Sequence, residues 1–234
     1  YVVGVLGAKG GMGVSTVALN LAISYQNLNR VNVIAAEMKP GQGSWAQELH
    51  LSSTGGLTSL LQKSAARLTQ PVVSAALTST VHGVQLLLAS NDCRDVELVN
   101  ATTQLEAVLK QLPLLASLVI LDVGTPFHPA FSMISDNCDE FILVTEPQPT
   151  SARHAQSLAQ ELSNNFRGTT KTLNIVTLNR NQSNRVLSQN EVEQIIGQPV
   201  LLNFPAAIDL VYNATGHFIP LVIAEPEGII AQQF

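Results

Sequence analysis

Charged residues are scarce in this sequence, and the basic ones are outnumbered. Only 12% of the 234 residues are charged, with 12 Lys and Arg against 17 Asp and Glu, so the net charge is −5. Binding to nucleic acid needs clustered Lys and Arg, because they displace the counterions of the phosphate backbone. We therefore expect no nucleic-acid partner for this chain.

Cysteine is almost missing, and no residues show the spacing of a metal site. The two cysteines, Cys93 and Cys138, lie far apart and have no nearby cysteine partner. This arrangement excludes a disulfide framework and a CxxC zinc site, so buried free thiols in a reducing cytoplasm are the simpler interpretation. The five histidines lack HxxxH spacing, and none is predicted to bind a metal.

A long apolar run is also missing. No stretch approaches the ~18 residues that span a membrane, and no secretory segment precedes Val2. We expect a cytoplasmic domain. The sequence starts within a strand pattern and ends where a helical pattern begins near Glu227, so a fragment of a longer chain is expected.

Hydrophobic residues, at 46%, are plentiful and follow a repeating pattern. Short apolar runs alternate with amphipathic stretches, as in repeated βαβ units. We predict one α/β domain over residues 1–234, with a mainly parallel, doubly wound sheet of about seven or eight strands. Strands are expected near 2–6, 32–36, 84–89, 117–122, 140–145, 173–178 and 199–203. Helices are expected near 14–28, 57–62, 102–112, 150–163, 189–196 and 206–213, with a cap at Thr102 or Thr103 and a capping box of Ser188 and Glu191.

A glycine-rich loop follows the first predicted strand. Its residues are Gly7-Ala8-Lys9-Gly10-Gly11-Met12-Gly13-Val14-Ser15-Thr16, and a helix is predicted to begin at its end. Glycines let successive backbone amides turn toward a phosphate, and the start of a helix adds a favourable dipole. Against the pattern GxxxxGK[ST], the loop has Ala8 for the first glycine and Val14 for the lysine. A tight turn without a ligand is the structural alternative.

Two residues are candidates for holding Mg²⁺. Ser15 occupies the position from which such loops present a hydroxyl to the metal ion. Asp122 ends the apolar run 118–121, where a carboxylate can hold the water shell of the ion. The alternatives are structural, with Ser15 satisfying the helix end and Asp122 capping a helix.

The loop resembles the deviant Walker A motif K-G-G-x-G-K-[ST]-T of the MinD, ParA and CpaE proteins. The resemblance implies a P-loop NTPase fold and a site for ATP or ADP with Mg²⁺, formed by Lys9, Gly10, Gly11, Met12, Gly13, Val14, Ser15 and Thr16. It identifies Lys9 as the lysine that reaches across a homodimer to the partner's nucleotide. Val14 replaces the second lysine of the motif, which implies weak or absent hydrolysis.

The second predicted strand departs from the same family. Its end resembles the family's I-D-x-D segment, with Ala35 in place of the first carboxylate and Glu37 in place of the second. Glu37 is expected to orient a water as general base, although its extra methylene moves the carboxylate by more than ~1 Å. A solvated glutamate that faces Lys39 is the alternative. The candidate catalytic residues are therefore Lys9, Glu37 and Asp122.

Matches to the family extend over roughly residues 2–225. Asn179 and Arg180 resemble its NR pair, in which the asparagine reads adenine, and Pro205 resembles the proline that borders the base. An asparagine that forms a turn is the alternative at position 179. One further stretch resembles the V-T-E-P-x-x-x-S-x-R-x-A pattern of the CpaE/TadZ branch, with matches at Thr145-Glu146-Pro147, Ser151, Arg153 and Ala155.

The resemblance also implies a function and partners. In the CpaE/TadZ branch, an ATP-bound homodimer localises a Tad/Flp (type IVb) pilus or related envelope secretion machine, and a receiver-like domain lies upstream. A weakly hydrolysing localisation factor is our first hypothesis, acting at a pole or at the inner face of the membrane through partners or segments outside this sequence. A nucleotide-independent pseudo-ATPase scaffold is the second, favoured by Ala8, Val14 and Ala35. A chromosome or plasmid partition ATPase is third, because it needs a basic patch.

Overall fold

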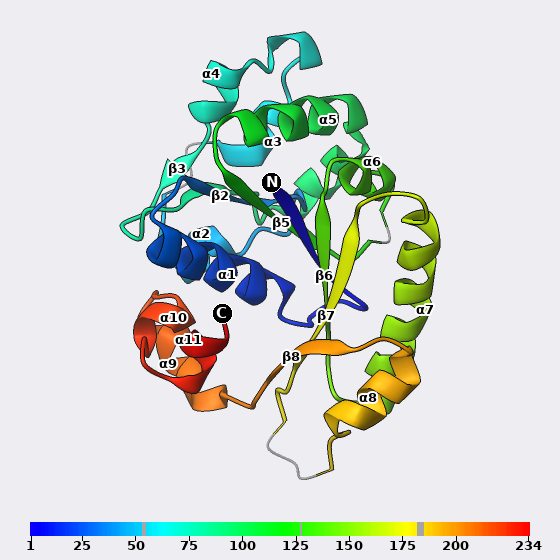
Figure 1. The fold of residues 1–234 in the computed structure, drawn as a ribbon. Helices are drawn as coiled ribbons and strands as arrows, with labels where there is room; N and C mark the ends of the chain where they lie inside the picture. The colour runs from blue at the N-terminus through cyan, green and yellow to red at the C-terminus, as the bar shows by residue number, and fades with distance from the viewer. Residues whose placement is uncertain (53–54, 127, 182–184) are drawn as a thin grey trace.

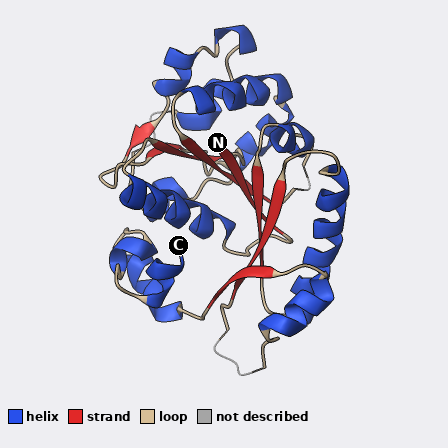
Figure 2. Cartoon of the chain, viewed as in Figure 1, coloured by secondary structure: helices blue, strands red, loops and turns tan. Residues whose placement is uncertain are grey.

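The computed structural model describes residues 1–52, 55–126, 128–181 and 185–234. Its centre is an eight-stranded sheet with the order β3-β4-β2-β5-β1-β6-β7-β8 (Figures 1 and 2). Every pairing is parallel except that of β3 with β4. The strands are β1 (Val2–Gly7), β2 (Val33–Glu37), β3 (Thr78–Ser79), β4 (Gln85–Leu87), β5 (Leu118–Gly124), β6 (Glu140–Thr145), β7 (Thr172–Leu178) and β8 (Val200–Phe204).

Helices cover both faces of the sheet (Figure 1). One face packs against α1 (Val14–Asn29), α2 (Trp45–Glu48), α9 (Ile208–Gly216), α10 (Leu221–Ala224) and α11 (Ile229–Gln233). The other packs against α3 (Gly56–Leu61), α4 (Gln70–Ser74), α5 (Thr102–Gln111), α6 (Phe131–Asp136), α7 (Pro149–Asn165) and α8 (Gln189–Ile196). Three 3₁₀ turns complete this side, η1 (Ala65–Arg67), η2 (Cys93–Asn100) and η3 (Leu112–Leu114).

The apolar runs of the sequence become strands because both of their faces are buried. In β1, Val3 and Val5 pack into the cluster beneath α1, whereas Val2 and Leu6 pack into the cluster beneath α5 and α7. A strand covered on both sides needs apolar residues at consecutive positions rather than at alternate ones. Among the described residues, no helix combines the length and hydropathy needed to cross a lipid bilayer.

The predicted fold class is confirmed, and the seven predicted strands and six predicted helices are all present. The short β3, α2, α4, α6 and α10 were not predicted, because two to six residues carry too little periodicity. The capping box of Ser188 and Glu191 is confirmed. The cap of α5 is Ala101 rather than a threonine, and Cys93, predicted to be buried, is exposed because it opens the surface turn η2.

The carboxyl ends of the parallel strands lie along one edge of the sheet. The glycine loop follows β1, Lys39 comes two residues after β2, and Asp122 lies near the end of β5. Glu146, Asn179 and Pro205 each follow directly on β6, β7 and β8. Ligands of open α/β sheets bind outside this edge, so the topology brings nearly every candidate residue to one place.

Candidate nucleotide-binding site

The backbone of the glycine loop presents unpaired donors. Gly11 and Gly13 have φ values of +73° and +83°, a conformation that side chains with a Cβ rarely adopt. Within the described part of the chain, none of the amides of residues 10–16 donates a hydrogen bond. No side chain caps the start of α1 either. Unpaired amides at the start of a helix are the donors that anion sites in proteins use.

Two side chains of the loop point into the protein instead. Met12 is fully buried, and Val14 is 7% exposed within the apolar cluster beneath α1. A Cβ placed on Gly7 would lie 2.8 Å from Cγ2 of Val14, so Val14 fills the space next to the end of β1. Met12 and Val14 therefore contribute backbone amides to the loop and no side-chain donor.

Ser15 and Asp122, the two predicted Mg²⁺ ligands, are brought together by a lysine. Nζ of Lys39 lies 2.5 Å from Oγ of Ser15 and 2.7 Å from Oδ2 of Asp122. The Lys39 side chain is 13% exposed and that of Asp122 is fully buried. Neither structural alternative is confirmed. The hydroxyl of Ser15 does not cap the start of α1, and Oδ1 of Asp122 accepts from the amide of Gly124 rather than from the start of a helix.

Lys39 occupies the place between Ser15 and Asp122 where Mg²⁺ was expected. A hydroxyl and a carboxylate near one another are a donor set that suits this ion. Here the same two oxygens contact an ammonium group, whose positive charge repels a metal ion at that place. In this arrangement the residues fit a lysine, and they do not fit Mg²⁺ between them.

Glu37 is fully buried, so the alternative of a solvated glutamate is wrong. Its Oε1 accepts from the amides of Ser44 and Trp45, at 2.7 Å and 3.2 Å, and its Oε2 accepts from the amide of Ala89 at 2.9 Å. Burial raises the pKa of Glu37 to about 7, while these amides and Lys39 oppose the rise. Both oxygens are engaged by the backbone, a geometry that favours anchoring of the loop after β2 over activation of a water.

Trp45 connects this loop to the glycine loop and was not predicted. The side chain is fully buried, and its Nε1 donates to the carbonyl of Ser15 at 3.1 Å. Trp45 is the only tryptophan of the chain. Its indole thus touches the backbone of the residue that also contacts Lys39, which makes its fluorescence a reporter for this site.

Lys9, the predicted intermolecular lysine, is paired within its own chain. Its Nζ lies 3.6 Å from Oε2 of Glu146, and the Lys9 side chain is 39% exposed. The same carboxylate accepts from Nε of Arg180 at 2.7 Å, contacts its Nη2, and accepts from the hydroxyl of Ser151 at 3.3 Å. Arg180 therefore forms an ion pair with Glu146. Glu146 was not predicted as a site residue and was named only as part of a longer motif.

A cavity of about 520 Å³ adjoins the glycine loop. It brings together predicted residues from three segments, and its lining includes Gly13, Thr16, Asn179, Arg180 and Pro205. Oδ1 of Asn179 accepts from the amide of Asn181 at 2.9 Å, as the turn alternative predicts. Its Nδ2 has no acceptor among the described residues and remains able to read a base. An apolar cavity next to an anion site suits a nucleotide.

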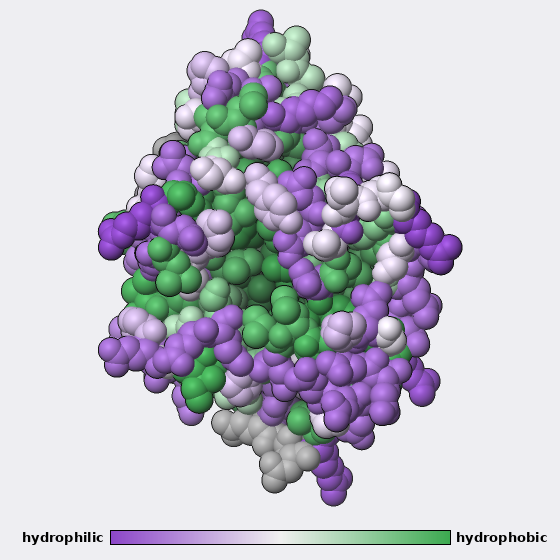
Figure 3. All heavy atoms as spheres, in the orientation of Figure 1, coloured by the Kyte–Doolittle hydropathy of each residue, from purple (hydrophilic) through white to green (hydrophobic). Residues whose placement is uncertain are grey.

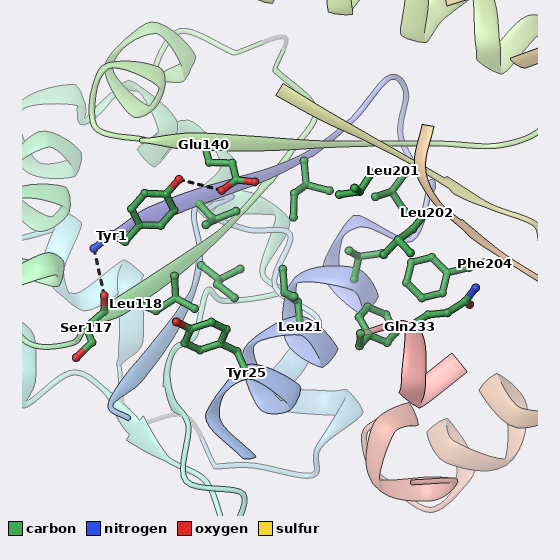
Figure 4. A pocket seen from close by; sticks show the side chains of 16 residues that line it. Tyr1, Leu21, Tyr25, Ser117, Leu118, Glu140, Leu201, Leu202, Phe204 and Gln233 are labelled. Atoms are coloured by element: carbon green, nitrogen blue, oxygen red, sulfur yellow. Dashed lines mark hydrogen bonds between the residues drawn. The ribbon is translucent and has the colours of Figure 1, made fainter. Parts of the chain in front are cut away.

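A second hollow lies on the same face of the sheet as α1, between α1 and β8 (Figure 3). It has a volume of about 370 Å³ and is mainly apolar, and its Glu140 accepts a hydrogen bond from the hydroxyl of Tyr1 at 2.9 Å (Figure 4). Phe204 and Phe234, whose ring centroids are 4.6 Å apart, line both hollows. None of the glycine-loop residues lines this groove, so it is separate from the candidate phosphate site.

Solved structures resemble this chain over nearly its whole length. A ParA family ATPase from Chlorobium tepidum is 20% identical with a TM-score of 0.86, covering 99% of this chain and 95% of that one. MinD from Pyrococcus horikoshii with Mg-ADP is 22% identical with a TM-score of 0.82, covering 99% and 91%. The MinC:MinD complex of Aquifex aeolicus is 16% identical with a TM-score of 0.78, covering 99% of this chain and 91% of that one. The chain has the fold of the ParA and MinD ATPases.

No family model and no curated protein matches the sequence. Within the ParA/MinD fold, the structure gathers the glycine loop, Asn179, Arg180 and Pro205 around one cavity. It also places Lys39 between Ser15 and Asp122, which the sequence reasoning missed. The available signal was a lysine just beyond the carboxyl end of an apolar strand, where ligand-binding residues of such sheets gather.

Proposed function

We propose that this chain binds ATP and ADP, forms a homodimer over its nucleotide face, and localises a Tad/Flp (type IVb) pilus or a related envelope secretion assembly. One observation carries the nucleotide part of the proposal. The unpaired amides of residues 10–16 adjoin the cavity that Asn179 and Pro205 line. A phosphate chain fits the first feature and a base fits the second.

The dimer and the pilus assembly rest on the resemblance to the CpaE/TadZ branch. Lys9 is partly exposed on the nucleotide face, as a residue that reaches a partner must be. The motif residues Glu146 and Ser151 form one hydrogen-bonded group next to it. The recruitment of an assembly is consistent with the MinD neighbour that was solved in complex with MinC.

Weak hydrolysis follows from what the site lacks. Without a lysine at Val14, one charge-assisted hydrogen bond to phosphate is lost, a loss of about 1.5–3 kcal/mol that the amides of the loop can offset in part. The loss of a positive group from the transferring phosphoryl lowers the rate by about 10²–10³. Because Glu37 is engaged by three backbone amides, no free carboxylate on β2 compensates. We therefore expect this chain to bind nucleotide and to hydrolyse ATP only slowly.

Titration of the purified protein with ATP and ADP tests the proposal. Trp45 fluorescence reports binding, since the indole contacts Ser15, and light scattering reports size. Saturable fluorescence changes with both nucleotides, and a dimer that forms with ATP, are expected. Absence of any change at millimolar nucleotide, checked by calorimetry, contradicts the nucleotide part of the proposal.

The scaffold alternative has one specific observation in its favour. Lys9 already pairs with Glu146 of its own chain, as it would in a protein whose dimer does not need a trans contact to nucleotide. A dimer of the same affinity with and without ATP would favour the scaffold. The partition alternative shares the ParA/MinD fold, and the net charge of −5 weighs against its DNA contacts.

A further inference from the structure

We propose that the ammonium group of Lys39 takes the place of the divalent metal ion, so that this chain binds the phosphates of ATP and ADP without Mg²⁺. The inference rests on the proposed nucleotide binding and adds the cation that accompanies it. It is carried by the position of Nζ, which contacts both groups expected to hold the metal, Ser15 Oγ at 2.5 Å and Asp122 Oδ2 at 2.7 Å.

The hydrogen bonds of this group leave donors for a ligand. A lysine ammonium has three N–H donors, and two of them are directed to Ser15 and Asp122. The third has no acceptor in the part of the chain that the structure describes, so it can donate to a phosphate oxygen. Because Ser15 accepts from Lys39, its own hydroxyl hydrogen is also available to a phosphate. One lysine thus provides the charge and the orientation of the hydroxyl that a metal ion provides elsewhere.

Asp122 depends on this lysine. Its side chain is fully buried, and Oδ2 has no hydrogen-bond partner in the described part of the chain apart from the contact with Nζ of Lys39. A buried carboxylate needs a paired charge, and the ammonium already supplies it. A metal ion could bind only after Lys39 had moved away, since two cations at this distance repel each other strongly.

The backbone around Lys39 is held in place. The amide of Met38 donates to the carbonyl of Asp122 at 2.9 Å, and that of Gly43 donates to the carbonyl of Ser90 at 2.8 Å. A Cβ on Gly41 would lie 2.6 Å from the backbone nitrogen of Val96, so the loop packs tightly on its neighbour. The lysine is therefore positioned before any ligand arrives, which lowers the entropic penalty of binding.

Lys39 also addresses the substitutions that set this chain apart. Val14 removes the phosphate-binding lysine of the loop, and Ala35 removes a carboxylate of β2 that serves the metal in the resembled family. A site without that lysine needs another positive charge near the phosphates, and a site without that carboxylate binds a metal ion less well. Lys39, which lies beside Ser15, supplies the positive charge without needing a metal ion.

The first test uses the unaltered protein. ATP and ADP are titrated with Trp45 fluorescence as the readout, once with excess EDTA and once with millimolar Mg²⁺. We expect dissociation constants that agree within about twofold. A gain of about tenfold or more with Mg²⁺ overturns the inference and leaves nucleotide binding intact. Absence of binding in both conditions refutes the proposed function, and the inference with it.

The second test exchanges the cation. Lys39→Met should weaken ATP binding in EDTA by about tenfold or more, regain affinity with Mg²⁺, and bind Mn²⁺ together with ATP in electron paramagnetic resonance titrations that show no such ion in the unaltered protein. Lys63→Met is the matched control, because Lys63 is exposed and its Nζ donates to the carbonyl of Ser59 on the surface of the domain, away from the glycine loop. The control should bind like the unaltered protein in both conditions.

A third variant covers the case in which Lys39→Met leaves Asp122 unpaired and unfolds the domain. Lys39→Met combined with Asp122→Asn removes both buried charges. This double variant should lose affinity in EDTA and fail to regain it with Mg²⁺. If either folded Lys39 variant binds ATP in EDTA as tightly as the unaltered protein, Lys39 only neutralises Asp122 and the inference is wrong.

Discussion

Glu146 holds Lys9 within its own chain, with 3.6 Å between Oε2 of the glutamate and Nζ of the lysine. The resembled family uses this lysine across a dimer, so the two contacts compete for one side chain. The pair is partly exposed, and such pairs contribute roughly 0–1 kcal/mol. The free energy needed to release Lys9 is therefore small, and in the proposed dimer Glu146 would modulate the affinity rather than prevent dimerisation.

Glu146→Gln tests this competition. Gln keeps the size of the side chain and an acceptor for Ser151, and it removes the charge that attracts Lys9. We expect ATP-dependent dimerisation to tighten by up to about fivefold, with nucleotide affinity of the monomer unchanged. Analytical ultracentrifugation with ATP measures the first, and fluorescence titration measures the second. Weaker dimerisation would mean that Glu146 itself belongs to the interface.

Lys9→Ala tests the intermolecular role directly. A lysine this early in the glycine loop should contact the partner's nucleotide, so its removal should weaken ATP-dependent dimerisation more than it weakens binding by the monomer. The same two measurements separate the effects. Equal losses in both would show that Lys9 serves the nucleotide of its own subunit.

Val14→Lys restores the missing lysine of the loop. The new ammonium should raise ATP affinity by about tenfold, or ~1.4 kcal/mol, through a charge-assisted bond to phosphate. Turnover should stay low while Lys39 keeps Mg²⁺ away, and should rise by at least about tenfold in Val14→Lys with Lys39→Met, since neighbouring charges are not additive. Val14→Met is the uncharged control. An unchanged affinity in folded Val14→Lys would show that the loop does not hold phosphates in the P-loop manner.

Glu37 should make the stability of the domain depend on pH. Burial raises its pKa from 4.5 to about 7 in the folded state, so the folded protein binds the proton more tightly than the unfolded chain does. Its contribution is fully present below about pH 4.5 and is lost as the pH rises through about 7, a change of order 3 kcal/mol. Urea unfolding between about pH 4.5 and 8 should show this fall, and Glu37→Gln should flatten it. A fall of the same size in Glu37→Gln would assign it to another group.

Glu37→Asp, which matches the resembled family more closely, should destabilise the domain and leave turnover unimproved. The shorter side chain cannot reach the amides of Ser44, Trp45 and Ala89 together. A buried amide left unpaired costs about 1–3 kcal/mol. Denaturant unfolding and phosphate release measure the two effects, and a faster, equally stable Glu37→Asp protein would restore the general-base hypothesis.

Asn179→Ala should reduce the preference for adenine. Among the residues that the structure describes, Nδ2 of Asn179 has no acceptor, and Asn179 lines the 520 Å³ cavity in which a base would lie. A lost hydrogen bond to the base should weaken ATP binding by about tenfold and leave GTP binding nearly unchanged. Asn165→Ala, at the exposed end of α7, is the matched control. Equal losses for both nucleotides would assign Asn179 to the turn alone.

The fold and the conformation of the glycine loop could be predicted because their signals are local. Strands buried on both faces appear as continuous apolar runs, and the alternation of these runs with amphipathic helices requires parallel strands joined by crossovers. The glycines at 11 and 13 mark a backbone that only glycine adopts easily, and their place between strand and helix marks an anion site. The edge of the sheet then collects Asn179 and Pro205 without further information.

The chemistry of the metal position was decided only by tertiary structure. Lys39 reaches Ser15 and Asp122 because β2 and β5 pair in a register that sets Glu37 opposite Asp122, and because the next loop folds back on residues 89–96. Glu37 is an anchor for the same reason, since its amide partners come from residues 44, 45 and 89. Contacts between segments so far apart depend on register and loop path. The order of side chains along one strand does not encode either of them.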